Sequence, residues 1–156
     1  MGVGKTTVGR VLAARLGREL IDSDERIEAL TERTVKQILD EDGLAAMRGY
    51  EADALFDALD DAEPRVIAAA AGVVLEPANR DRLEHADADV VWLIADPATL
   101  APRTATRDHR PWLDADPVGT LQQMQAERDA LYREVADRSV VVDGLTPDEI
   151  ADRILA

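Results

Sequence analysis

The sequence predicts an α/β fold in which a parallel sheet is flanked by helices. Short apolar runs alternate with amphipathic segments along the 156 residues, a pattern typical of strand–helix–strand units. The first residues, Gly2-Val3-Gly4-Lys5-Thr6-Thr7, have the residue types of the end of a phosphate-binding loop that runs directly into a helix. The length suits one domain over residues 1–156.

Periodicity and turn residues delimit the elements. Apolar side chains three or four positions apart predict the first helix, which Gly17 ends. The predicted helices are 6–16, 25–30, 35–39, the stretch from Gly43 to about Leu59, 77–85, 97–107, 117–137 and the stretch that begins at Pro147. The predicted strands are 20–21, 65–71, 89–95 and 139–142. The runs 65–71 and 89–95 are almost wholly apolar, so we expect them to be buried on both faces.

Three of these helices begin with recognisable caps. Asp96 and Asp116 each precede a proline at the first helical position, and Thr146-Pro147-Asp148-Glu149 is a capping box. Between the helices predicted at 97–107 and 117–137, residues 108–117 are polar and contain two prolines, which predicts a lid-like loop.

Composition excludes several classes of protein. The chain has no cysteine, so thiolate metal sites and disulfides are excluded, and its two histidines lie far apart in sequence. The net charge of −14 argues against nucleic acid as a partner. No apolar stretch is long enough for a membrane span, so we expect a cytoplasmic protein.

The N-terminal loop has the chemistry of a nucleotide site. Glycines let backbone N–H groups approach phosphate oxygens, Lys5 can reach the outer phosphates, and the Thr6 hydroxyl can ligate Mg²⁺. The alternative is an ordinary glycine-rich turn. The pattern's first glycine and the strand that precedes it are not among residues 1–156, so we expect about ten further residues upstream, roughly one strand and a turn.

Two carboxylates follow the first predicted strand. Ligands of open α/β sheets bind beyond the carboxyl ends of strands, and residues two apart on a strand share a face. Asp22 and Asp24 could therefore divide the work, one holding magnesium through water and the other holding a substrate hydroxyl. A solvated turn that caps the next helix is the alternative.

Arginines supply the candidate anion sites. Arg48 lies beside an apolar helical stripe, and Arg128 lies within one, which for a buried charge calls for an anionic partner. The alternatives are a structural ion pair or a side chain whose head reaches water. Arg103, Arg107 and Arg110 flank the lid and could meet a phosphoryl group, although the helix dipole alone would favour a basic helix end.

Taken together, six motifs resemble the shikimate kinase family over nearly the whole chain: GVGKTTVGRVLAARLG, IDSDERIE, MRGYE, AAGVVL, RPWL and RDALYREVAD. The resemblance implies a three-layer α/β/α P-loop kinase fold with a five-stranded parallel sheet and a lid. It also implies a monomeric enzyme of aromatic amino acid biosynthesis that uses ATP and magnesium to phosphorylate the 3-hydroxyl of shikimate.

The resemblance also implies a role for each matching position. The phosphates would be bound by Gly2, Val3, Gly4, Lys5, Thr6 and Thr7. Magnesium would be held by Thr6 and Asp22, and the reacting hydroxyl by Asp24. Arg48, Arg128 and the Ala71-Gly72 turn, with helices in residues 25–60, would bind the acid. Arg110 would reach the transferring phosphate from the lid, and Arg103 and Pro147 would lie near adenine.

The sequence departs from the family pattern in four places. The loop's first glycine is absent, Met47 replaces an aromatic residue, Ala130 replaces a proline, and Ala70-Ala71 replace two of three consecutive glycines. We expect both alanines to keep negative φ, so that Gly72 alone makes the close approach to the ligand. The family's first, central strand is also missing, which would leave the strands at 65–71 and 89–95 unpaired on one side or closed on one another. A kinase for another hydroxylated acid such as gluconate, or a nucleotide-binding homologue without catalysis, remain alternatives.

Overall fold

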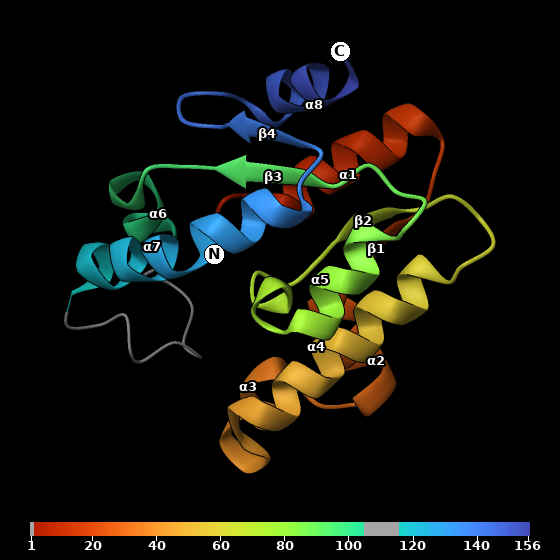
Figure 1. Cartoon of the computed structure of the whole chain (residues 1–156), viewed down its shortest axis with the longest axis vertical. Coiled ribbons are helices and arrows are strands. Elements are labelled where there is room, and N and C mark those ends of the chain that lie inside the picture. Colours follow the sequence, from red (N-terminus) through yellow and green to blue (C-terminus); the bar gives the residue numbers. More distant parts are fainter. Residues whose placement is uncertain (1, 105–115) are drawn as a thin grey trace.

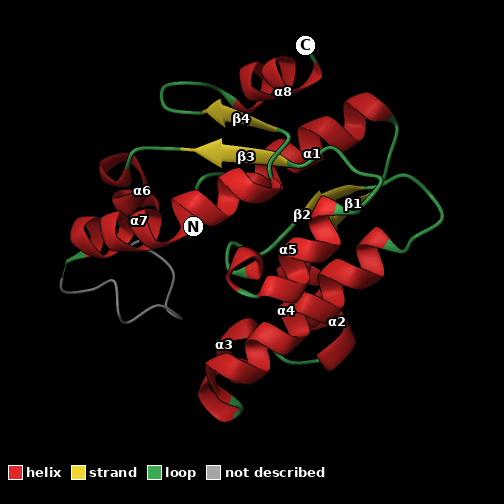
Figure 2. Ribbon diagram, in the orientation of Figure 1, coloured by secondary structure: helices red, strands yellow, loops and turns green. Residues whose placement is uncertain are grey.

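Helices surround two short parallel sheets, as Figures 1 and 2 show. The computed structural model describes residues 2–104 and 116–156. The elements are α1 (Lys5–Leu16), β1 (Leu20–Asp22), α2 (Ser23–Thr31), α3 (Val35–Glu41), α4 (Gly43–Leu59), β2 (Val66–Ala68), the 3₁₀ turn η1 (Val73–Leu75), α5 (Pro77–Glu84), β3 (Val91–Ile94), α6 (Pro97–Thr104), α7 (Pro117–Val135), β4 (Arg138–Val141) and α8 (Pro147–Leu155). The order of helices and strands is the one predicted from the sequence.

Each sheet consists of one parallel pair. Leu20 pairs with Val66 at the start of β1 and β2, and Val91 pairs with Arg138 at the start of β3 and β4. The strands β2 and β3 are shorter than the predicted runs 65–71 and 89–95, because each is paired only over the length that its short neighbour offers. Parallel pairing confirms the predicted α/β class.

Within the part of the chain that the structure describes, the facing edges of β2 and β3 are not paired with each other or with another strand. A cavity of about 640 Å³ lies between the two sheets, and its walls include Ile67, Ala68, Trp92 and Leu93. The sequence predicts that these two edges are either unpaired or closed on one another, and in the described residues they are unpaired. The prediction that both strands are fully buried is wrong, since all four residues of β3 are only half-buried beside this cavity.

The helix ends follow the predicted chemistry. Gly17 ends α1 at φ 62°, a left-handed conformation that glycine adopts without strain. The Thr146 side chain accepts a hydrogen bond from Glu149 N, and the Glu149 side chain accepts one from Thr146 N, which confirms the capping box at α8. Asp116 caps α7 by accepting from Gly119 N. These local interactions set where the helices begin and end.

Apolar packing joins the elements in three clusters. The largest lies between α1, β3, β4, α6, α7 and α8, a second between α4, η1, α5 and α7, and a third between α2, α3 and α4. No helix within residues 2–104 and 116–156 is both long and apolar enough to cross a membrane.

Candidate active site

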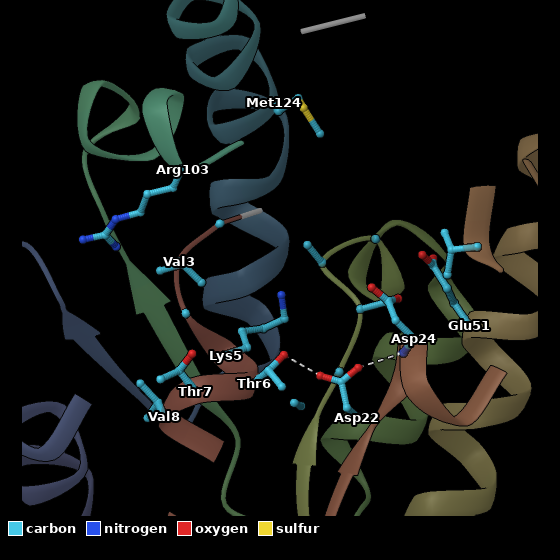
Figure 3. A pocket seen from close by; sticks show the side chains of 18 of the residues that line it. Val3, Lys5, Thr6, Thr7, Val8, Asp22, Asp24, Glu51, Arg103 and Met124 are labelled. Atoms are coloured by element: carbon cyan, nitrogen blue, oxygen red, sulfur yellow. Dashed lines mark hydrogen bonds between the residues drawn. The ribbon is translucent and has the colours of Figure 1, made fainter. Parts of the chain in front are cut away.

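A pocket of about 460 Å³ opens at the carboxyl ends of the strands (Figure 3). It is lined by segments that are far apart in sequence: the N-terminal loop, the residues after β1, α4, the turn after β2, and parts of α6, α7 and α8. The predicted site residues among its walls are Gly2, Val3, Gly4, Lys5, Thr6, Thr7, Asp22, Asp24, Arg48, Ala71, Gly72, Arg103, Arg128 and Pro147. Arg107, Arg110 and residues 108–115 of the predicted lid (108–117) lie outside the described residues.

The N-terminal loop turns through two left-handed glycines. Gly2 has φ 68° and Gly4 has φ 95°, values that other residues rarely adopt. A Cβ on Gly2 would also lie 3.0 Å from Thr104 Cγ2, so this position is closely packed. Gly4 precedes α1 and provides no side-chain cap, so the positive end of the helix is directed at the pocket. This geometry is that of an anion site.

Thr6 and Asp22 meet at the floor of the pocket. The Thr6 hydroxyl donates to Asp22 Oδ2 at 2.5 Å, as drawn in Figure 3. Asp22 Oδ1 accepts from the backbone N–H groups of Asp24 and Glu25 at 3.0 and 3.3 Å. The Asp22 carboxylate therefore caps α2, as the alternative for this residue states. Its other oxygen also faces Thr6 of the N-terminal loop.

This pair suits magnesium. Among residues 2–104 and 116–156 no group of three or more His, Cys, Asp or Glu side chains could hold an ion. A hydroxyl and one carboxylate oxygen leave most positions to phosphate oxygens and waters, which is how Mg²⁺ is commonly held beside nucleotides.

Asp24 lines the same pocket from the helix α2 and not from the strand β1. The sequence predicts that Asp22 and Asp24 point the same way because they are two apart on a strand. This prediction is wrong, because β1 ends at Asp22 and Asp24 belongs to the first turn of α2. Asp24 nevertheless lines the pocket, and in Figure 3 its carboxylate lies between Asp22 and Glu51.

Arg48 is held by an ion pair and by a glycine. Its Nη1 donates to Glu51 Oε2 one turn further along α4. Burial raises the pKa of Glu51, which is 8% exposed, while Arg48 opposes that shift. A Cβ built on Gly72 would lie 1.5 Å from Arg48 Nη1, so the guanidinium lies directly against the Gly72 backbone. The ion-pair alternative is thus correct for Arg48, and the paired side chain still lines the pocket.

Arg128 projects from α7 into the same region. Its Nη1 lies 3.5 Å from the Ala71 carbonyl oxygen, at the outer limit of a hydrogen bond. Its Nε is buried and has no hydrogen-bond partner among the described residues, and Arg128 forms no ion pair with any of them. The ion-pair alternative therefore does not describe Arg128 in this part of the chain, and an anion in the pocket would provide the missing partner.

The turn after β2 has ordinary backbone geometry. Glu32 is the only non-glycine residue with positive φ in the described chain, so Ala70 and Ala71 keep negative φ as expected. Gly72 has φ −90° and makes the close approach to Arg48 alone. Ala70 packs against the second apolar cluster, so its methyl group contributes to the core.

Sequence reasoning missed two residues that hold this turn. The buried Ser23 hydroxyl accepts from Ala70 N at 3.3 Å, and the Tyr132 hydroxyl donates to the Ala71 oxygen at 2.7 Å. The spacing of four residues between Arg128 and Tyr132 could have indicated that both lie on one face of α7. Ser23 gave no comparable signal.

The pocket has two ends with different chemistry. In Figure 3, Arg103 lies on one side, Asp24 and Glu51 lie on the other, and Lys5 and Thr6 lie between them. Pro147, at the first position of α8, also lines this pocket. The arrangement leaves room for an extended anionic ligand that spans the loop.

Comparison with known proteins finds shikimate kinases. The family model for shikimate kinase matches residues 1–156. A shikimate kinase of Halorhodospira halophila is 45% identical over 156 residues, covering 99% of this chain and 87% of that protein. A shikimate kinase of Burkholderia lata is 44% identical over 138 residues, covering 88% and 74% of the two chains.

Solved structures agree with these matches. The structure of shikimate kinase from Acinetobacter baumannii in complex with shikimate has a TM-score of 0.92 and 35% identity, covering 99% of this chain and 86% of that one. Shikimate kinase from Bacteroides thetaiotaomicron has a TM-score of 0.87 and 26% identity, with coverage of 99% and 91%. The P-loop kinase fold and the membership of the shikimate kinase family predicted from the motifs are confirmed. The chain belongs to the shikimate kinase family, and it is an ATP-dependent phosphotransferase that acts on an alcohol group.

Proposed function

We propose that the pocket binds ATP and shikimate together and transfers the γ-phosphate to the 3-hydroxyl of shikimate. The observation that carries this proposal is one pocket in which Lys5 and Thr6 lie between Arg103 and Asp24, with Arg48 and Arg128 also among its walls. A nucleotide fits the first side, with Arg103 and Pro147 near adenine, and a small acid with a reactive hydroxyl fits the second. The products are shikimate 3-phosphate and ADP.

The loop and the first carboxylate serve the nucleotide. Backbone N–H groups from Gly2 to Thr7 surround the phosphates, and Lys5 neutralises the charge on their outer oxygens. Thr6 would hold magnesium directly, and Asp22 would hold it through water. When bound, the ion would supply positive charge that offsets the charge developing on the phosphates.

Asp24 and the arginines serve the acceptor. Asp24 holds the 3-hydroxyl in line with the γ-phosphorus and accepts its proton as the new O–P bond forms and the bond to the β-phosphate oxygen breaks. Arg48 and Arg128 hold the shikimate carboxylate, a task to which the planar guanidinium is suited. Arg110, outside the described residues, is assigned to the transferring phosphate by the resemblance alone.

The remaining proposals concern the whole protein. It acts as a monomer of one domain in the cytoplasm, with small molecules rather than nucleic acid or membranes as partners. The net charge of −14 supports the exclusion of nucleic acid.

A coupled assay of ADP release tests the function. ATP and magnesium are supplied with shikimate, with gluconate, or with no acceptor. We expect turnover that depends on shikimate. Equal rates with gluconate would identify a different acceptor, and an equal rate without any acceptor would leave only ATP hydrolysis.

Removal of the carboxylate contact should affect one substrate. Arg128→Ala should raise the KM for shikimate by about tenfold to a hundredfold, because a charge-assisted contact of about 1.5–3 kcal/mol is lost. The KM for ATP should change little. Wild-type protein should also bind shikimate far more tightly than shikimate methyl ester, as isothermal titration can measure.

Arg10→Ala is the control, since the Arg10 side chain is 62% exposed beside Glu25 and does not line the pocket. It removes the same charge without reaching the pocket. Equal affinity of wild-type protein for the acid and the ester would contradict a carboxylate contact at Arg128.

A methyl group at position 72 should disturb the other arginine. Gly72 has negative φ, so alanine is allowed by the backbone, but its Cβ would occupy the place of the Arg48 guanidinium. Gly72→Ala should therefore raise the KM for shikimate by about tenfold or more, equivalent to about 1.4 kcal/mol. Gly49→Ala is the control, because Gly49 lies beside Arg48 on α4 and a Cβ added there would meet no atom within 4 Å. Similar kinetics for Gly72→Ala and Gly49→Ala would show that Arg48 does not need its observed position.

A further inference from the structure

One peptide separates the two arginines assigned to the substrate carboxylate. On one side, Gly72 lies against the Arg48 guanidinium, with no room for a Cβ between them. On the other side, the preceding carbonyl of Ala71 faces α7 and Arg128. The position of this peptide therefore sets how far apart Arg48 and Arg128 can lie.

The Ala71 carbonyl has two donors of unequal quality. Tyr132 Oη lies at 2.7 Å, an ordinary length for a hydroxyl donor, whereas Arg128 Nη1 lies at 3.5 Å. The two side chains are four residues apart on α7 and so lie on the same face of the helix. Tyr132 thus satisfies the carbonyl, so Arg128, which also lies beside the tyrosine hydroxyl, is not needed as the donor to that oxygen.

Tyr132 is itself held in place. Its ring stacks on Trp92 of β3, with ring centroids 5.3 Å apart and an angle of 18° between the planes. The ring also packs against the apolar cluster between α4, η1, α5 and α7. Burial raises the pKa of its hydroxyl, while the charges of Arg128 and Arg48 oppose that shift.

We infer that Tyr132 is a positioning residue for the acid substrate. Its hydroxyl holds the Ala71 carbonyl, so that Arg128 stays free to bind the carboxylate. This inference rests on the roles proposed above for Arg48 and Arg128. Without the tyrosine hydroxyl, the Ala71 carbonyl would keep only the long contact to Arg128. Because a partly buried acceptor would then be poorly satisfied, the guanidinium would move toward that oxygen and away from the ligand.

Tyr132→Phe tests this inference, since it removes one oxygen and keeps the ring. The KM for shikimate should rise about fivefold to tenfold, the size expected for one hydrogen bond. The kcat and the KM for ATP should stay within about twofold of wild type, because the nucleotide side of the pocket is untouched. Tyr50→Phe is the matched control: Tyr50, on α4, is the chain's other tyrosine and bonds to Arg33 at 3.2 Å.

A double-mutant cycle separates positioning from general stability. In an Arg128→Ala background, Tyr132→Phe should change the KM for shikimate by less than about twofold, because the side chain through which it acts is gone. An equal effect in both backgrounds would overturn the inference, as would an unchanged KM in the single variant with only a lowered Tm. Wild-type protein without shikimate-dependent turnover would instead disprove the proposed function, and this inference with it.

Discussion

Lys5→Ala should lower the kcat of phosphoryl transfer by roughly two or more orders of magnitude, since this reaction depends on positioning and on neutralising charge. Lys5 begins α1, follows the left-handed Gly4 and lines the pocket between its two ends. The proposed role of its ammonium group is to neutralise charge on the phosphates of ATP. The loss should appear in kcat at saturating ATP, measured by coupled ADP release.

The chain offers a matched control for this loss. Lys36 is the only other lysine, and it lies on the exposed face of α3 with Asp40 as its partner at 2.5 Å. Lys36→Ala removes the same charge and should leave kcat within about twofold of wild type, as expected for an exposed pair. If Lys5→Ala retained a tenth or more of the wild-type kcat, the assigned role of Lys5 would be incorrect.

Asp24→Asn should also reduce kcat by roughly two or more orders of magnitude, for a different reason. The amide keeps the shape of the side chain, but it can neither accept the proton of the 3-hydroxyl nor hold that hydroxyl through a charged oxygen. Asp24 lines the pocket beside Glu51, whose pKa is raised mainly by burial and further by the Asp24 charge. The KM for ATP should change little, because the phosphate loop keeps its contacts.

Asp53→Asn provides the comparison, since Asp53 is exposed on α4 and does not line the pocket. Single-turnover measurements would show whether the chemical step itself is slowed. Near-native turnover of Asp24→Asn would mean that another group orients or deprotonates the hydroxyl.

Local chemistry accounts for most of the agreement between sequence and structure. Caps such as Thr146 and Asp116 act within three residues along the chain, so the pattern of side chains is enough to locate the helix starts. The Gly-Val-Gly-Lys-Thr segment likewise encodes its own geometry, because Gly4 supplies the left-handed residue from which α1 begins.

At Asp24 the structure has the start of a helix in place of the predicted strand end. The two-residue spacing from Asp22 implied a shared strand face, yet the side chain of Asp22 bonds to Asp24 N and starts a helix there. Both carboxylates reach the pocket because the strand end and the helix start adjoin the same loop. Placement at the carboxyl end of a strand was the sound part of the prediction.

The sequence by itself determined the α/β class, the order of the helices and strands, the phosphate loop and most of the charged residues that line the pocket. Only the tertiary structure decided how those charges are held: the Gly72 backbone against Arg48, Ser23 on Ala70 N, and Tyr132 on the Ala71 carbonyl. It also decided that β3 is half-buried beside a cavity. The physical reason is distance along the chain, since periodicity and capping act over a few residues, whereas Tyr132 and Ala71 are separated by 61 positions and meet only through packing.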